Sequence, residues 1–234
     1  MRLGVLFLFA LVSRAQSAPP DLGGVYQAIP SGATLAGGLK NVGSPSDIAL
    51  LPVAVQQMKT VNLKDDPVKM CQPVGPFRMM ARERTKIELV PARGMMVMLF
   101  EDISLGVMRT VYLNRGHREK VEPNWLGDSV GHWEGDTLVV DVTGFNDKTW
   151  LVGTGTFHTD ALHVTERYTR VDKDQINYDI TMEDPNVLTK PWIMHTNLML
   201  REGTRLQEYV CAENNLAPAF YERMEKNGVN FRRP

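Results

Sequence analysis

Apolar and polar residues alternate along most of the chain between residues 84 and 211, and this alternation limits the fold more than any other feature. A period of two places successive side chains on opposite faces of a β-strand, whereas helical positions recur about every 3.6 residues. Clusters of glycine, proline, asparagine and aspartate separate the alternating segments and favour turns. We predict a mainly β fold of about eight strands, a barrel or sandwich in which sequential neighbours pair antiparallel. The alternating segments are TKIELV, MMVMLFE, VMRTVYL, DTLVVDV, LHVTERYTR, QINYDITME, WIMHTNLML and RLQEYVC.

The segments outside the alternating region fit one domain built around these strands. A Gly/Pro-rich lead spans residues 19–45, and residues 46–63 predict a short helix with Pro52 in its first turn. Residues 215–227 predict a C-terminal helix with an apolar stripe. About 215 residues are enough to bury roughly 70% of the unfolded surface around one core. We therefore predict a single β-rich domain over residues 19–234.

The first 18 residues have the layout of a secretory signal peptide. Met1 and Arg2 precede an apolar run, residues 3–12, and small residues suited to a signal peptidase follow it. The run is about ten residues long, about half of what a membrane-spanning helix needs, although an uncleaved anchor is the alternative. We expect a secreted or periplasmic protein with no integral membrane segment after cleavage.

The charge balance bears on the partners. Lys and Arg number 26 and Asp and Glu 27, giving a net charge of -1. A chain without a basic field offers no general attraction to nucleic acid. We expect a small-molecule ligand or substrate as partner and no cofactor, and the sequence does not predict an oligomeric state.

The chain has two cysteines, Cys71 and Cys211. In an oxidising compartment an even pair in an otherwise cysteine-free chain predicts a disulfide. Such a bridge would connect an early loop to the last predicted strand. The alternative, a nucleophilic cysteine, requires an electropositive environment that the neighbouring sequence does not suggest.

The segment GHWEGDTLVVDVTGFND, residues 131–147, is the most patterned part of the chain. Gly135 supplies a conformation that other residues reach only at a cost, and an alternating run begins directly after it. We predict a hairpin in which Glu134 and Asp136 are turn acids. A catalytic pair of these carboxylates is the alternative, but a solvated turn does little to separate two pKa values.

The candidate catalytic residues are His158 and Asp160, which follow the glycine-rich GTGTF. On an extended segment the two side chains share a face, so that Asp160 can orient His158 as a general acid/base. His163 would point the other way, which argues against a metal site at H-x-D-x-x-H, and we expect no metal. A structural or solvent-facing histidine is the alternative reading of His158.

Candidate substrate-binding residues come from two segments. In FNDKTW, Asn146 and Asp147 would orient a substrate and Trp150 would offer a stacking face. His195 shares a strand face with polar and apolar residues and is a further candidate. The simpler interpretation is a structural histidine of the barrel wall whose ring is hydrogen-bonded to its neighbours. His117 is predicted to be a loop residue.

The strand QINYDITME carries Asn177, Asp179, Thr181 and Glu183 on one face. In a barrel the polar face of a strand ordinarily lies outside. If it lay inside, the protein would have a polar cavity. The thirteen methionines could adapt an apolar pocket to a ligand or serve as core filler.

Two resemblances add to these expectations. DLGGVYQ resembles the G-x-W opening of calycin and lipocalin-type barrels, with Tyr26 in the place of the tryptophan. This resemblance implies a calycin-like barrel. The segments CQPVGPFR, DSVGHWEGDTLVVDVTGFNDKTW, HTDALHVTERYTR, EDPNVLTKPW and EYVCAENN together resemble a large group of uncharacterised exported proteins of environmental bacteria, over most of residues 65–216. The second resemblance implies export and a shared β-rich domain.

Two functions follow as hypotheses. The first is an exported, metal-independent enzyme (a lyase, isomerase or hydrolase) that acts on a small organic or glycosidic substrate through His158 and Asp160. The second is a calycin-like protein that binds an apolar or aromatic small molecule. A structural protein of the cell envelope is a third possibility, and the sequence favours the enzyme slightly.

Overall fold

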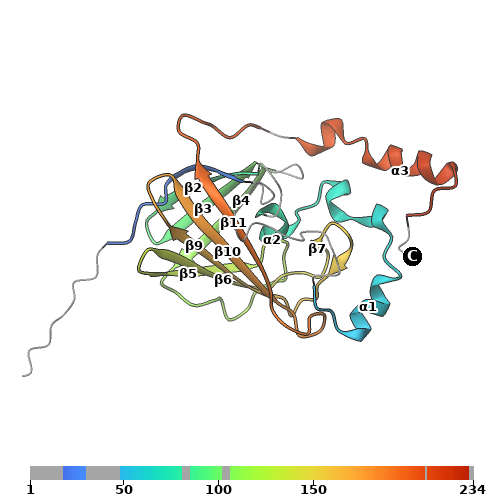
Figure 1. Cartoon of the computed structure of the whole chain (residues 1–234), viewed down its shortest axis with the longest axis horizontal. Coiled ribbons are helices and arrows are strands. Elements are labelled where there is room, and N and C mark those ends of the chain that lie inside the picture. Colours follow the sequence, from blue (N-terminus) through green and yellow to red (C-terminus); the bar gives the residue numbers. More distant parts are fainter. Residues whose placement is uncertain (1–17, 30–47, 81–84, 102–105, 209, 232–234) are drawn as a thin grey trace, which may run out of the picture.

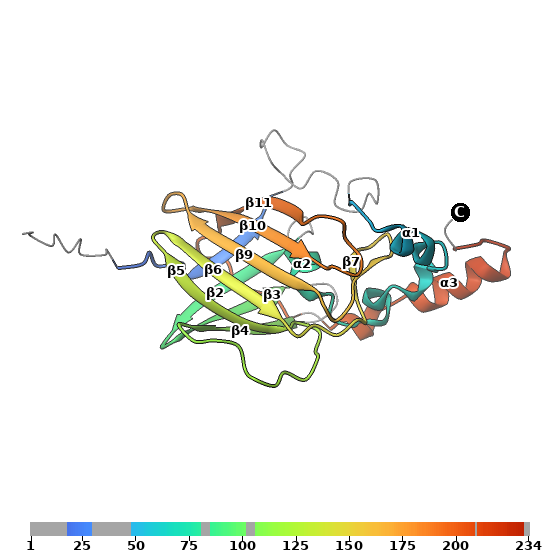
Figure 2. The same ribbon diagram turned by 90° about the horizontal axis from the view of Figure 1, so that it is seen from below.

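The computed structural model describes residues 18–29, 48–80, 85–101, 106–208 and 210–231. Its central feature is a closed β-barrel with the strand order β1-β11-β10-β9-β6-β5-β4-β3-β2 (Figure 1). A separate two-stranded sheet, β7-β8, lies near one end of the barrel (Figure 2). The predicted mainly β fold is confirmed as a barrel. The strands are β1 (Gly24–Ala28), β2 (Lys86–Ala92), β3 (Met95–Glu101), β4 (Gly106–Leu113), β5 (Asp128–Glu134), β6 (Thr137–Thr143), β7 (Trp150–Val152), β8 (Thr156–Phe157), β9 (His163–Arg170), β10 (Gln175–Glu183) and β11 (Trp192–Leu200).

β1 closes the barrel, because it pairs with β2 on one side and with β11 on the other. Tyr26 is opposite Ile87 in β2 and opposite Leu200 in β11. The segment that contains β1 is Gly/Pro-rich and was expected to form an irregular lead. Tyr26 and Ala28 are buried in the core of the barrel, and this burial outweighs the weak local preference of its glycines.

The alternation of the sequence separates the inside of the barrel from the outside. In β10, Ile176, Tyr178, Ile180 and Met182 are buried, and the polar residues between them are wholly or partly exposed. The prediction that the polar face of this strand lies outside is confirmed. Methionines 79, 80, 96 and 98 belong to the buried core, which supports their interpretation as core filler.

The expectation that sequential strands pair antiparallel is wrong for β4 and β5. β4 pairs parallel with β5, so residues 114–127 carry the chain back along the outside of the barrel. This is the long connection that a parallel pair requires. β6 pairs with β9, and the β7-β8 sheet is inserted between them in sequence.

The motif at residues 131–147 forms the predicted hairpin. β5 and β6 pair in register up to Glu134 and Thr137, which leaves Gly135 and Asp136 as a two-residue turn. Gly135 has φ 59°, the left-handed conformation that glycine adopts without strain. The side chain of Glu134 accepts from Arg167 and contacts His132 on the exposed outer face, so Glu134 is a surface acid.

The helices gather at the barrel end where β7 lies (Figure 1). Within the region predicted to be helical, α1 forms over Pro52–Met58, with Pro52 in its first turn, and a 3-10 turn forms over Leu63–Asp65. The short helix α2 (Gly75–Met80) has every residue buried. α3 (Ala217–Lys226) confirms the C-terminal helix and projects beyond the barrel (Figure 2).

The disulfide between Cys71 and Cys211 is present, with a Cα–Cα distance of 5.7 Å. Cys71 follows the 3-10 turn Pro67–Met70, and Cys211 begins the 3-10 turn Cys211–Asn214. The prediction of a last strand over residues 205–211 is wrong, since the described residues there form no strand. This segment has few apolar residues facing the barrel, and most of its described side chains are exposed.

Some expectations fall on parts of the chain that lie outside the described residues. These parts are residues 1–17 of the predicted signal peptide, residues 30–45 of the lead, and the first two residues of the predicted helix. In the described part of the chain, the helices are all too short or too polar to cross a membrane.

Candidate functional site

The candidate site lies at the barrel end, where residues 145–158 leave β6, form the β7-β8 sheet and return toward β9. α2 packs against β7 there (Figure 1). Phe77 of α2 and Phe145 are fully buried, and their rings are 5.9 Å apart at the centroids. These two rings form the apolar surroundings of His158.

His158 is 1% exposed and lies edge-on to both rings. Its ring centroid is 5.5 Å from that of Phe77 and 6.1 Å from that of Phe145. Its Nδ1 is 2.9 Å from the carbonyl oxygen of Thr159. Because a carbonyl oxygen only accepts, Nδ1 must carry the proton that it donates, which makes Nε2 the lone-pair nitrogen of the neutral ring.

Burial lowers the pKa of the His158 imidazole. The hydrogen bond to the Thr159 carbonyl and the negative charges of Asp184 and Asp147 act in the opposite direction, but they are weaker than desolvation. The lowered pKa favours the neutral form of His158 at pH 7. A neutral imidazole with an available Nε2 can take a proton or accept a hydrogen bond.

Buried polar atoms without a partner are concentrated in this segment. Within the described part of the chain, five buried side-chain atoms lack a hydrogen-bond partner, and four of them belong to residues 149–158. Folded proteins satisfy nearly all buried polar groups, so such a concentration calls for an explanation. A ligand that carries several polar groups would provide one. The four atoms are Oγ1 of Thr149, Thr154 and Thr156, and Nε2 of His158.

The loop that carries His158 is held by Asp184, which is 2% exposed. The Thr159 backbone N–H donates to Asp184 Oδ2 at 2.6 Å, and the Thr159 hydroxyl donates to Oδ1 at 3.0 Å. Asp184 directly follows β10, so the loop is attached to the barrel wall. The sequence marks this position only as the start of a D-P-N turn.

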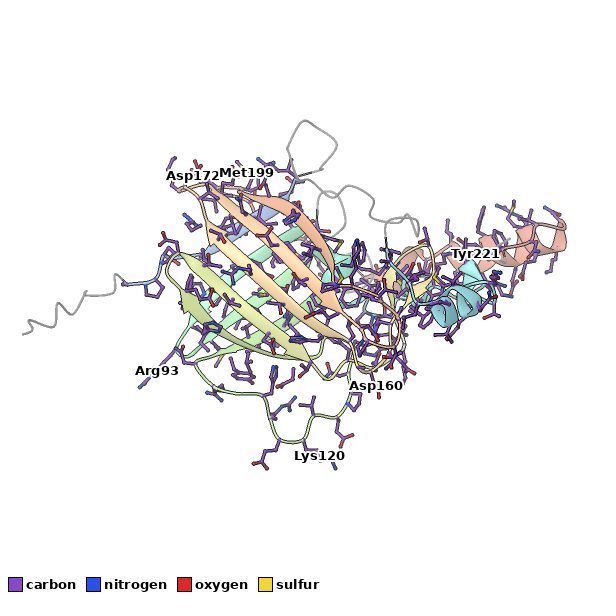
Figure 3. The ribbon with its side chains drawn as sticks, turned by 60° about the horizontal axis from the view of Figure 1, so that its bottom comes forward. Arg93, Lys120, Asp160, Asp172, Met199 and Tyr221 are labelled. Atoms are coloured by element: carbon purple, nitrogen blue, oxygen red, sulfur yellow. A yellow bond between two sulfur atoms is a disulfide. The ribbon has the colours of Figure 1, made fainter. Side chains whose placement is uncertain are left out.

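The structure does not bring Asp160 to His158. β8 ends at Phe157 and residues 158–162 form no strand, so the alternation that would align the two side chains is absent. Asp160 is exposed, at the barrel end opposite Asp172 (Figure 3). The expectation that Asp160 orients His158 by a direct hydrogen bond is wrong, since Nδ1 is bonded to a carbonyl and Nε2 has no partner among the described residues.

The other predicted binding residues are divided between the site and the barrel surface. Asn146 is buried, and Asp147 is exposed but near enough for its charge to act on His158. Trp150 is half-buried and pairs with Phe157 in the small sheet. His195 lies on the exposed outer face of β11 and bonds to Asp179, so it takes no part in this site.

A second group of titratable residues covers the outside of β5, β6 and β9. His117 Nδ1 is 2.9 Å from Asp128 Oδ2, and its Nε2 is 2.6 Å from Asp141 Oδ1. His163 Nε2 is 2.5 Å from the other oxygen of Asp141. His163 therefore points away from buried His158, as the sequence indicated. His117 was expected to be a simple loop residue, but it attaches its loop to the barrel.

A third group lies inside the barrel and is fully buried. Arg109 donates to Glu166 Oε2 at 2.5 Å and to Ser129 Oγ at 2.9 Å. The hydroxyls of Tyr168 and Tyr178 donate to Glu166 Oε1 at 2.9 and 2.8 Å. Burial and the neighbouring Glu166 raise the pKa of both tyrosines. Because both Glu166 oxygens are engaged, this group is best explained as a structural network across the core. In the sequence, this network is indicated by Glu166, a charged residue on the otherwise apolar face of LHVTERYTR.

An open surface pocket of about 400 Å³ lies beside the His158 loop. It reaches Asp184 from the outer side of the barrel, and His163 also lines it. Ala161 of the His158 loop lines it as well, so the pocket touches both this loop and Asp184.

No protein-family model matches the chain, and no curated protein matches it significantly.

Proposed function

We propose that this protein is an enzyme for a small organic or glycosidic substrate, in which His158 acts as a general base through Nε2. The chemistry would be that of a lyase, isomerase or hydrolase that needs no metal. The observation that carries the proposal is the buried Nε2 of His158, which has no partner among the described residues while Nδ1 is engaged. A base must be unprotonated before it acts, and the lowered pKa of His158 meets this requirement at neutral pH.

The residues of this segment support a substrate of mixed polarity. Phe77 and Phe145 provide apolar contact to His158, and the unpaired threonine hydroxyls of residues 149–156, in the same segment of the chain, are proposed to hydrogen-bond to the substrate. Asp147 and Trp150 lie in the same segment and are proposed to contact the substrate. Asp160 is left out of the catalytic group.

A second candidate is a calycin-like protein that binds an apolar or aromatic molecule. It is favoured by the aromatic surroundings of His158, in which Nε2 would accept one hydrogen bond from the ligand. This role requires no proton transfer.

We also propose that the protein is exported. The Cys71–Cys211 disulfide supports this, because disulfides persist in oxidising compartments and are rare in the cytosol.

Turnover of a substrate panel tests the enzyme against the binding protein. The panel contains lactones, glycosides, enolisable ketones and phenols, and it is run on the wild type, His158→Gln and the control His132→Gln. His132 is an exposed histidine on the outer face of β5. We expect His158→Gln to lower kcat by about 10²- to 10⁴-fold, the usual contribution of a general base, and His132→Gln to have no effect.

Two results would count against the enzyme. Full turnover by His158→Gln would rule out His158 as the base. Binding of a panel compound that shifts the His158 Nε2 resonance, is lost in His158→Gln and gives no turnover would support the binding protein instead.

A further inference from the structure

We propose that Asp184 is the positioning residue of His158, and that it fixes the imidazole in the Nδ1–H form by holding Thr159. This inference rests on the proposed function, since the tautomer matters to catalysis only if Nε2 acts on a substrate. It assigns to Asp184 the role that the sequence suggested for Asp160.

The contacts form a continuous path of three residues. Asp184 accepts two hydrogen bonds from Thr159, one from the backbone N–H at 2.6 Å and one from the hydroxyl at 3.0 Å. The carbonyl of the same Thr159 accepts from His158 Nδ1 at 2.9 Å. The position of this carbonyl therefore depends on the carboxylate of Asp184.

Asp184 is itself held firmly on the barrel. Its Oδ1 accepts from the backbone N–H of Asn186 at 3.0 Å, and its carbonyl oxygen accepts from the N–H of Val187 and of Leu188. Leu188 in turn forms a bridge with Leu50, next to α1. The Asp184 carboxylate thus anchors the irregular loop of residues 158–162 to the barrel wall.

The energetic argument also favours Asp184 over Asp160. Hydrogen bonds to an ionised carboxylate are roughly twice as strong as neutral ones, and burial strengthens them further. Asp184 is buried, whereas Asp160 is exposed to water. A residue that fixes the hydrogen bond at one imidazole nitrogen determines which of the two nitrogens carries the proton.

The experiment measures the tautomer of the His158 ring by ¹⁵N NMR at pH 7.5, in the wild type, Asp184→Asn and the control Asp160→Asn. In Asp184→Asn one amide oxygen can still accept from the Thr159 hydroxyl, but the amide nitrogen cannot accept from the Thr159 N–H. We expect the Nδ1–H form in the wild type and in Asp160→Asn, and a mixture in Asp184→Asn. A pure Nδ1–H form in Asp184→Asn would overturn the proposal.

A second variant covers the case in which Asp184→Asn does not fold. Thr159→Ala removes the hydroxyl bond to Asp184 and the bonds that the hydroxyl accepts from Ala161 N–H and Asn186 Nδ2, and it keeps the bond from the Thr159 backbone N–H to Asp184. We expect the Nδ1 proton of His158 to exchange with water roughly 2- to 10-fold faster, the change that corresponds to one hydrogen bond. Exchange at the wild-type rate would overturn the proposal.

These measurements need no substrate, so their outcome is separate from that of the panel. A changed tautomer together with unaffected turnover in His158→Gln would support the role of Asp184 and refute the proposed function. An unchanged tautomer in Asp184→Asn together with lost turnover in His158→Gln would support the proposed function and refute the role of Asp184.

Discussion

At the residue scale, the buried Arg109–Glu166 pair shows how a charge can be placed inside a barrel. Each charge is costly to bury, and each is compensated by its partner and by neighbouring hydroxyls, except that Arg109 Nη1 has no partner among the described residues. The pair crosses from β4 to β9, strands that are not neighbours in the sheet. Its removal should therefore affect the whole core.

Glu166→Ala should destabilise the protein by about 3–5 kcal/mol, because it leaves Arg109 buried and unpaired. The double variant Arg109→Met/Glu166→Leu should be more stable than Glu166→Ala, since no charge remains in the core. Urea denaturation checks both values. A double variant less stable than Glu166→Ala would show that the pair contributes more than its own desolvation costs.

The candidate site could be predicted from the sequence only in part. His158 was identified because it follows a glycine-rich segment, and the structure gives it a buried position in which Nε2 has no partner among the residues that the structure describes. Asp160 was assigned by strand alternation, which does not apply to the irregular residues 158–162. Asp184 lies 25 residues from Thr159, and no local pattern indicates such a contact.

At the element scale, the β5-β6 hairpin depends on Gly135. A Cβ at this position would meet no atom within 4 Å, so the only cost of a larger residue is its positive φ. Gly135→Ala should cost about 1–2 kcal/mol, the penalty for an L-residue in the left-handed region. Gly116→Ala is the control, because Gly116 has similar space and no positive φ. Thermal unfolding measures both, and equal losses would contradict this explanation.

The loop of residues 114–127 depends on the charge of His117. Both ring nitrogens face carboxylates, which only accept when ionised, so this arrangement favours the doubly protonated, cationic ring. Burial would lower the pKa of His117, but the hydrogen bonds to Asp141 and Asp128 outweigh it and raise the pKa above its ordinary value of 6.5. Figure 3 shows this loop extending from the barrel to Lys120.

The raised pKa gives a pH dependence with a defined sign. The folded state binds the proton more tightly than the unfolded state, so this contribution to stability is complete below pH 6.5 and disappears as the pH rises through the folded pKa. The stability difference between the wild type and His117→Gln should therefore shrink above pH 6.5. His132→Gln is the control, and a difference that stays constant from about pH 6 to 9 would refute the cationic His117.

Most strands were predictable because their core-facing positions alternate over seven to nine residues, as in β9, β10 and β11. β1 was missed because its five residues lie among glycines, and the strand predicted at 205–211 does not form. The parallel β4-β5 pair could not be predicted, since a strand's pattern does not encode its neighbour's direction. Whether these strands form, and in which direction they pair, depends on side-chain burial in the closed barrel.

At the scale of the whole molecule, the disulfide connects two segments outside the barrel. It attaches the C-terminal arm, residues 210–231, to residues 59–71, which follow α1. Lys64 pairs with Glu225 at 3.0 Å, and the Lys69 ammonium lies over the ring of Tyr221. The arm otherwise projects from the barrel, as the position of Tyr221 in Figure 3 shows. The bridge is thus a covalent cross-link between the two segments.

Cys71→Ala/Cys211→Ala should lower the free energy of unfolding by about 2–5 kcal/mol, because the bridge closes a loop across a sequence separation of 140 residues. The far-UV circular dichroism of the barrel should persist, since the bridge lies outside it. Urea denaturation with and without reductant gives the value. Loss of the β signal in the variant would mean that the arm is needed to form the barrel.

The account depends most on the protonation state of His158, and an NMR titration of its ring nitrogens from about pH 4 to 9 measures that state directly. We predict a neutral ring at pH 7 with the proton on Nδ1 and a pKa below 6.5. A ring that is cationic at pH 7, or that carries its proton on Nε2, would contradict the account, because Nε2 would then have no lone pair to offer a substrate.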